Sequence, residues 1–215
     1  MRTLCAISFL ALGQYLVFAV VEEPPVAPIG KDVVVNASIF YDSNYAKWHK
    51  EKKPKLDIAQ DLKHLVSLAQ GYFHKQNVTV TFNVSTVENV SNYLVFDTEK
   101  SIKGNKTLRN MTKFANSRKA PNNSIYYHFS GYSIDANIAK QPLKKRGLSD
   151  TATTGTFCTK PSAAILLYFP GSNNTLAFVH ATARTFGVTD HLIFTPKDIE
   201  AMNATFAKCS TREKK

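Results

Sequence analysis

The feature that most constrains the fold is the run SAAILLYF at residues 162–169, which is apolar almost throughout. A strand with one exposed face alternates apolar and polar residues, whereas an unbroken apolar run is typical of a strand covered on both faces. Pro170 and Gly171 end the run. The segment therefore predicts a central strand with helices packed on both sides of its sheet.

Strand and helix patterns alternate along the rest of the chain. Apolar residues at strand spacing occupy three further segments: residues 33–40, 78–87 and 125–129. Helical spacing occupies four: residues 58–72 with Asp57 placed as a cap, 108–114, 176–186 and 196–208. Polar stretches predict loops at residues 50–55 and 137–156. We therefore expect the α/β class, as a three-layer α/β/α sandwich with a mixed sheet, in a single domain over residues 32–209 with a basic tail at 210–215.

The amino terminus has the features of a targeting segment. Arg2 precedes an apolar stretch that passes through the small-residue pattern VFA at residues 17–19. We expect a signal peptide at residues 1–19, an extended leader at residues 20–31, and a secreted, extracellular protein. No later segment offers about 18 consecutive apolar residues, so we expect no membrane partner.

Asn-x-Ser/Thr sites are abundant, which favours a glycoprotein. We expect glycosylation at most of the nine sites: Asn36, Asn77, Asn83, Asn89, Asn105, Asn110, Asn122, Asn173 and Asn203. Asn83 is the site least expected to be used, because it lies in a predicted strand and would face a covering helix.

Three cysteines occur, and Cys5 leaves with the signal peptide. Cys158 and Cys209 then remain as a pair in an oxidising compartment. The sequence therefore predicts one disulfide.

The charge balance is strongly basic, with a formal net charge of +11 from 27 lysine and arginine and 16 aspartate and glutamate residues. A basic surface attracts polyanions, although it also serves solubility. For an exported protein we expect a sulfated glycan or an acidic protein, and no nucleic acid. The basic run KKR at residues 144–146 predicts a solvated loop, with a processing site or a glycan contact as alternatives.

The stretch HATARTFGVTDH at residues 180–191 matches the frame of a zinc-protease signature in part. That signature, H-E-x-x-H-x-x-G-x-x-H, supplies three zinc-binding imidazoles and a glutamate that acts as general base. In this frame the five defined positions hold His180, Ala181, Arg184, Gly187 and Asp190. Only the first histidine and the glycine agree with the signature.

The segments around this stretch agree with one family in order and spacing. They are residues 56–76, 125–132 (IYYHFSGY), 155–165 (GTFCTKPSAAI), 177–180 (AFVH) and 206–209 (FAKC). Together they resemble the catalytic domain of reprolysin-like (adamalysin-type) metalloproteases, most closely the short secreted members found in tick saliva. The resemblance covers roughly residues 32–209. It implies a metzincin-like fold, a disulfide between Cys158 and Cys209 that closes the domain, and a host protein as target.

The departures from that family point away from catalysis. Ala181 supplies no carboxylate to activate water, and Arg184 places a fixed cation where a neutral imidazole should bind zinc. The family's methionine turn is missing, because only residues 191–195 join the two last helices and Met202 falls in the final one. We therefore expect no catalytic residue and no metal or other cofactor. The sequence predicts a pseudo-metalloprotease that binds an extracellular protein without cleaving it.

Two alternatives stay open. One is an atypical zinc metallopeptidase that uses His180, Asp190 and His191 as ligands, because aspartate holds the third position in some related proteases. The other is a basic glycosaminoglycan-binding protein for which the fold is incidental. The metal content of the protein distinguishes the first alternative from a pseudo-metalloprotease. Salt-dependent retention on heparin distinguishes the second.

Overall fold

The computed structural model describes residues 27–135, 149–189 and 193–210. The predicted features outside these ranges are the signal peptide, the first part of the leader, residues 137–148 of the predicted loop with its basic run at 144–146, Asp190 and His191, and the last residues of the basic tail. None of the described helices is both long and apolar enough to cross a membrane.

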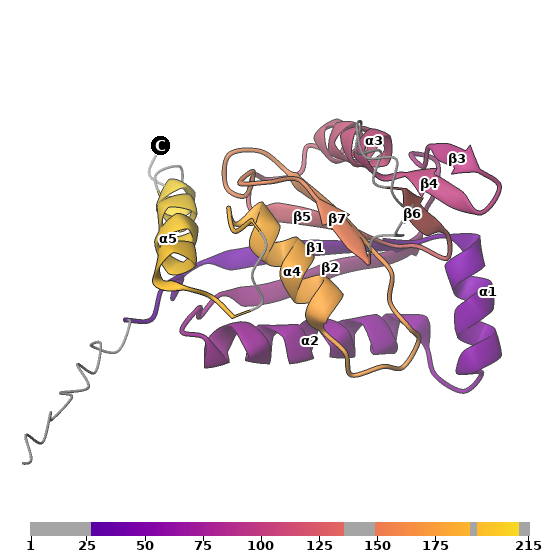
Figure 1. Cartoon of the computed structure of the whole chain (residues 1–215), viewed down its shortest axis with the longest axis horizontal. Coiled ribbons are helices and arrows are strands. Elements are labelled where there is room, and N and C mark those ends of the chain that lie inside the picture. Colours follow the sequence, from indigo (N-terminus) through magenta and orange to yellow (C-terminus); the bar gives the residue numbers. More distant parts are fainter. Residues whose placement is uncertain (1–26, 136–148, 190–192, 211–215) are drawn as a thin grey trace, which may run out of the picture.

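Two sheets organise the chain (Figure 1). The main sheet has the order β2-β1-β5-β8-β7, and all of its pairings are parallel except that between β7 and β8. Its strands are β1 (Val34–Tyr41), β2 (Thr81–Asn89), β5 (Ser124–Phe129), β7 (Asp150–Ala152) and β8 (Ser162–Leu166). A smaller sheet, in the order β3-β4-β6, contains β3 (Phe96–Thr98), β4 (Ser101–Lys103) and β6 (Ser133–Asp135).

Five helices flank the sheets. They are α1 (Ser43–Lys52), α2 (Ile58–Lys75), α3 (Gly104–Ser117), α4 (Leu176–Thr185) and α5 (Pro196–Ser210). Helices α2 and α4 cover one face of the main sheet and α3 covers the other, while α1 and α5 lie at opposite ends of the molecule (Figure 1). This arrangement is the α/β sandwich that the sequence predicts.

Strand β8 shows why the run at residues 162–169 is apolar. Its side chains alternate between two hydrophobic clusters, with Ala164 and Leu166 on the side of α2 and α4, and Ala163 and Ile165 on the side of α3. All four are fully buried. The prediction of a strand covered on both faces is therefore confirmed.

Two sequence predictions about loops are wrong. Residues 50–52, expected to begin a charged loop, form the last turn of α1, whose sequence is rich in lysine and buries only Tyr45 and His49. Residues 150–152, expected to be loop, form β7. A helix that buries only two residues and a strand of only three residues show too few apolar positions for their periodicity to be recognised in the sequence.

The carboxyl-terminal helix is fastened to the domain by the predicted disulfide. Cys158 and Cys209 are bonded, with Cα atoms 4.9 Å apart, and Phe206 of α5 packs edge-on against Phe186. At the other end of the chain, Ile29 forms a parallel bridge with Val78. The contacts of the domain thus begin inside the segment expected to be an extended leader.

Candidate functional site

Helix α4 carries the first positions of the zinc-protease frame. Its buried side chains are Phe178, Val179, Ala181, Thr182, Ala183 and Thr185. His180 and Arg184 are both partly exposed, and residues four apart lie on one face of a helix. The structure therefore brings the first and second ligand positions of the frame to the outer side of α4.

His180 is held by a carboxylate from the edge of the sheet. Its Nδ1 lies 2.8 Å from Oδ1 of Asp150 in β7, and the Ser149 hydroxyl donates to the other carboxylate oxygen at 2.9 Å. The Asp150 side chain is 4% exposed, whereas that of His180 is 23% exposed. Asp150 thus fixes the orientation of a partly exposed imidazole. The sequence did not single out Asp150, because it lies in a stretch expected to be loop.

Ala181 occupies the position of the general base, and it faces the core. The residue is fully buried in the cluster formed by α2, α4 and the main sheet. A carboxylate at this position would lie among apolar side chains, where an unpaired charge is strongly disfavoured. The packing of α4 therefore suits alanine here and opposes a glutamate.

The three frame positions on α4 do not by themselves fit a zinc ion. The frame offers one imidazole at His180, a methyl group at Ala181 and a guanidinium at Arg184, and a guanidinium has no lone pair to donate. Within the described ranges, no three His, Cys, Asp or Glu side chains come together in a way that could hold a metal. Asp190 and His191 lie outside those ranges, so the ligand set of His180, Asp190 and His191 stays a prediction.

Gly187 has a role that needs no metal. Its φ is +105°, and the backbone N–H of the next residue, Val188, donates to the Ala183 carbonyl at 3.0 Å. This conformation ends α4, and glycine adopts it without the strain that a side chain would cause. The agreement of Gly187 with the zinc-protease frame is therefore explained by the end of the helix.

A second His–Asp pair is completely buried. Nε2 of His128 lies 3.2 Å from Asp42, which also accepts the backbone N–H groups of Tyr45 and Gly131. The Tyr93 hydroxyl lies 2.8 Å from the other nitrogen of His128. These bonds join the start of α1 to the end of β5, and every side chain involved is buried.

The electrostatics of this pair favour one protonation state. Burial tends to raise the pKa of Asp42, but the hydrogen bonds from His128 and from two backbone N–H groups lower it below its ordinary value. Burial lowers the pKa of His128, even though Asp42 opposes that change. The pair is therefore an aspartate anion beside a neutral imidazole, with Nε2–H donating to Asp42 and the Tyr93 hydroxyl donating to Nδ1.

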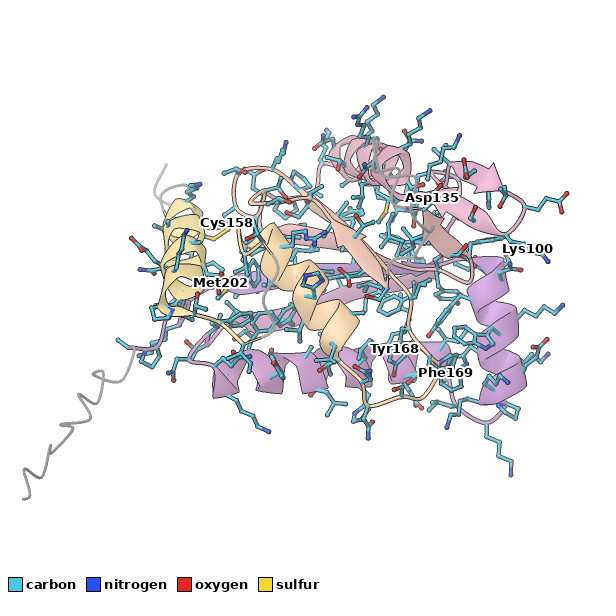
Figure 2. All side chains as sticks on the ribbon, viewed as in Figure 1. Lys100, Asp135, Cys158, Tyr168, Phe169 and Met202 are labelled. Atoms are coloured by element: carbon cyan, nitrogen blue, oxygen red, sulfur yellow. A yellow bond between two sulfur atoms is a disulfide. The ribbon has the colours of Figure 1, made fainter. Side chains whose placement is uncertain are left out.

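A third pair anchors the loop that follows β8. His49 lies 3.0 Å from Asp61, and Asp61 also accepts the backbone N–H of Gly171 at 2.9 Å. The Tyr168 hydroxyl contacts both Asp61 and the Ser172 carbonyl. Tyr168 and its exposed neighbour Phe169 lie between α4 and α1 (Figure 2). Because these groups are hydrogen-bonded to one another in the interior, we interpret this pair as structural.

A cavity of about 810 Å³ lies at the amino-terminal ends of β1 and β5. It is lined by residues 30–34, residues 121–123, Asn203, residues 206–208 and the disulfide between Cys158 and Cys209. None of the frame positions on α4 lines it. The hollow surface and the zinc-protease frame are therefore separate features.

The predicted glycosylation sites differ in exposure. Six are exposed: Asn77, Asn83, Asn89, Asn105, Asn173 and Asn203. The expectation that Asn83 faces a covering helix is wrong, since α3 leaves this part of β2 uncovered. Asn36, Asn110 and Asn122 are half-buried, and the side-chain amides of Asn36 and Asn110 donate to Asn123 and to the Tyr93 carbonyl. Glycosylation at each site stays a prediction.

No family model and no curated protein matches the sequence. Among solved structures, the chain is similar to one in a "Structure of a chaperone-substrate complex", with 8% identity and a TM-score of 0.45, over 74% of this chain and 24% of that one. It is also similar to metalloproteinase-II from Bacteroides fragilis, with 11% identity and a TM-score of 0.42, over 85% of this chain and 55% of that one. The chain thus spans about a quarter and about half of these structures. Both similarities are too low to carry an argument about activity.

Proposed function

We propose that the chain is a secreted, glycosylated pseudo-metalloprotease that binds a target protein without cleaving it. The observation that carries the proposal is the replacement of two zinc-protease frame positions on α4. The position of the general base is a core alanine, Ala181, and the position of the second ligand is a cation, Arg184. A helix with these two residues keeps the outline of a zinc-protease helix and lacks the groups that bind zinc and activate water.

The reprolysin-like character belongs to this proposal and rests on the resemblance in sequence. The mixed sheet with helices on both faces and the disulfide between Cys158 and Cys209 agree with what that resemblance implies. The target we propose is an extracellular protein of a host, of the kind involved in haemostasis or immunity. A pull-down from host plasma with the secreted protein is the experiment that identifies it.

The test of the missing activity is a cleavage assay. The protein is purified from a secreting host, supplied with zinc, and incubated with a denatured general protein substrate in the presence and absence of a chelator. We expect no cleavage under either condition. Cleavage that the chelator abolishes, and that a His180→Ala variant lacks, would contradict the proposal.

One observation favours the rival enzyme. Histidines that bind metals commonly donate their second ring nitrogen to a carboxylate, and His180 has such a carboxylate in Asp150 at 2.8 Å. In that alternative, His180, Asp190 and His191 would bind zinc. The discriminating variant is Asp150→Asn, which leaves the metal-free protein folded and weakens zinc binding only if His180 is a ligand. Unchanged zinc binding in this variant counts against the rival.

A further inference from the structure

The charged residues on the outer face of helix α3 are all basic. Its sequence, GNKTLRNMTKFANS, contains no acidic residue, and its inner side buries Thr107, Leu108 and Met111 among other residues. Lys106, Arg109 and Lys113 are exposed and follow one another at steps of three and four residues. This spacing puts the three cations on one line along the helix, opposite the buried side. We refer to them as the α3 ridge.

The ridge is a line of positive charge at the surface. Its ends are seven positions apart in the helix, so the Cα atoms of Lys106 and Lys113 are about 10 Å apart along the helix axis. In Figure 2, nitrogen-tipped side chains project from α3 away from the sheet. Like charges at this spacing repel one another and destabilise a helix. The three cations therefore repel one another in the free protein, and an anionic partner would relieve this repulsion.

Two acidic residues near α3 are paired with cations outside the ridge. Lys103, just before the helix, lies 3.3 Å from Asp97, and Arg118, just after it, lies 3.4 Å from Glu88. Within the part of the chain that the structure describes, no ion pair involves a ridge residue. The positive potential of the ridge is thus not cancelled by a neighbouring carboxylate.

The composition of the outer face distinguishes between polyanions. A helix that binds an anionic membrane needs large apolar side chains beside its cations, and none of the exposed large hydrophobic residues found in the described ranges lies on α3. Binding of single-stranded nucleic acid uses exposed aromatic rings for stacking, and the ridge offers none. A line of cations on a polar helix matches a flexible chain that carries anionic groups at intervals.

We propose that the α3 ridge binds a sulfated polysaccharide of the heparin class. The three exposed cations contact sulfate groups along the polysaccharide chain. The ridge lies on the face of the sheet opposite α4. This activity is therefore independent of the proposed pseudo-metalloprotease function, and either can fail without the other.

The experiment measures binding of the secreted protein to heparin over a range of salt concentrations. The test variant is Lys106→Ser/Arg109→Ser/Lys113→Ser. The control variant is Lys47→Ser/Lys50→Ser/Lys52→Ser, which removes the same charge from exposed positions of α1. All six side chains are exposed, and equal melting temperatures of the three proteins establish that the fold is intact.

Loss of three contacts with a linear polyanion lowers the slope of log Kd against log salt concentration by roughly two to three. We expect this change in the ridge variant, with affinity at least about tenfold weaker at low salt. The control variant should change the slope by less than about one. A Lys106→Arg/Lys113→Arg variant, which keeps the charge, should bind like the wild type.

Three results would overturn the proposal. Equal losses in the ridge and control variants would show that binding follows net charge. Equal affinity for heparin and for desulfated heparin would exclude recognition of sulfate. Tighter binding to anionic phospholipid vesicles or to single-stranded DNA than to heparin would assign the ridge to a different class of partner.

Discussion

Two of the three His–Asp pairs described above, His128–Asp42 and His180–Asp150, have the same chemistry and different surroundings. His128 and Asp42 are completely buried, and the bonds from Tyr93 and two backbone N–H groups complete their network. His180 and Asp150 form a shorter contact, at 2.8 Å, but the imidazole is 23% exposed. The difference teaches that a His–Asp pair becomes structural when every polar atom is used inside the protein. A pair with a partly exposed imidazole, such as His180–Asp150, can still contact a metal or a substrate, and it can also be altered without breaking the core.

The first prediction breaks the buried pair. Asp42→Ala removes the acceptor for His128 and for two backbone N–H groups, so it should lower the free energy of unfolding by about 3 to 5 kcal/mol. The matched control is Asp57→Ala, because Asp57 caps α2 through one exposed bond to Gln60 and should cost about 1 kcal/mol. Denaturant unfolding checks both values. Equal losses would show that the buried network adds nothing to an ordinary helix cap.

The second prediction concerns the two sides of α4. Ala181→Glu puts a carboxylate into a fully buried position and should cost on the order of 3 kcal/mol. Ala177→Glu, on the partly exposed outer side with His180, should change stability by less than about 0.5 kcal/mol. Thermal unfolding of the two variants measures the difference. A stable Ala181→Glu protein would mean that this position opens toward solvent.

The third prediction is a pH dependence that belongs to the buried pair. Burial lowers the pKa of His128 below the ordinary value of 6.5, so the folded protein binds this proton less readily than the unfolded chain does. Stability is therefore fully present above pH 6.5 and falls as the pH decreases below it, by at most about 1.4 kcal/mol per pH unit. The lowered pKa of Asp42 adds a further loss below about pH 4.

The variant that checks this assignment is His128→Gln, which has no titrating group at that position. Its stability should fall less than that of the wild type between pH 7 and pH 5. The same decrease in both proteins would assign the pH dependence to other groups.

The smallest effect is expected at the exposed pair. His180→Ala removes one hydrogen bond to Asp150 from a partly exposed side chain, and it should cost about 1 kcal/mol or less. Differential scanning calorimetry can resolve a change of this size. A loss comparable with that of Asp42→Ala would mean that His180 supports the fold as strongly as the buried network does.

The sequence predicts the layers of this fold better than it predicts the candidate site. The run at residues 162–169 and the helix after Asp57 carry long patterns. The helix is confirmed, and the covered strand is confirmed over Ser162–Leu166, although Phe169 at the end of the run is exposed. Asp150 and Asp42 escape prediction because each acts on a histidine far away in the sequence, and only folding brings β7 beside α4 and α1 beside β5. The zinc-protease frame identifies His180, but the direction in which Ala181 points depends on packing that the pattern of α4 alone does not reveal.

The central claim is that α4 has lost its metal, and the most direct measurement is the zinc content per chain. The protein is secreted into zinc-containing medium, dialysed, and analysed for metal beside its His180→Ala variant. We expect no stoichiometric zinc in either protein, because Arg184 stands where the second zinc-binding imidazole would be. One zinc per chain in the wild type that is lost in the variant would contradict it and would establish the zinc site of the rival enzyme.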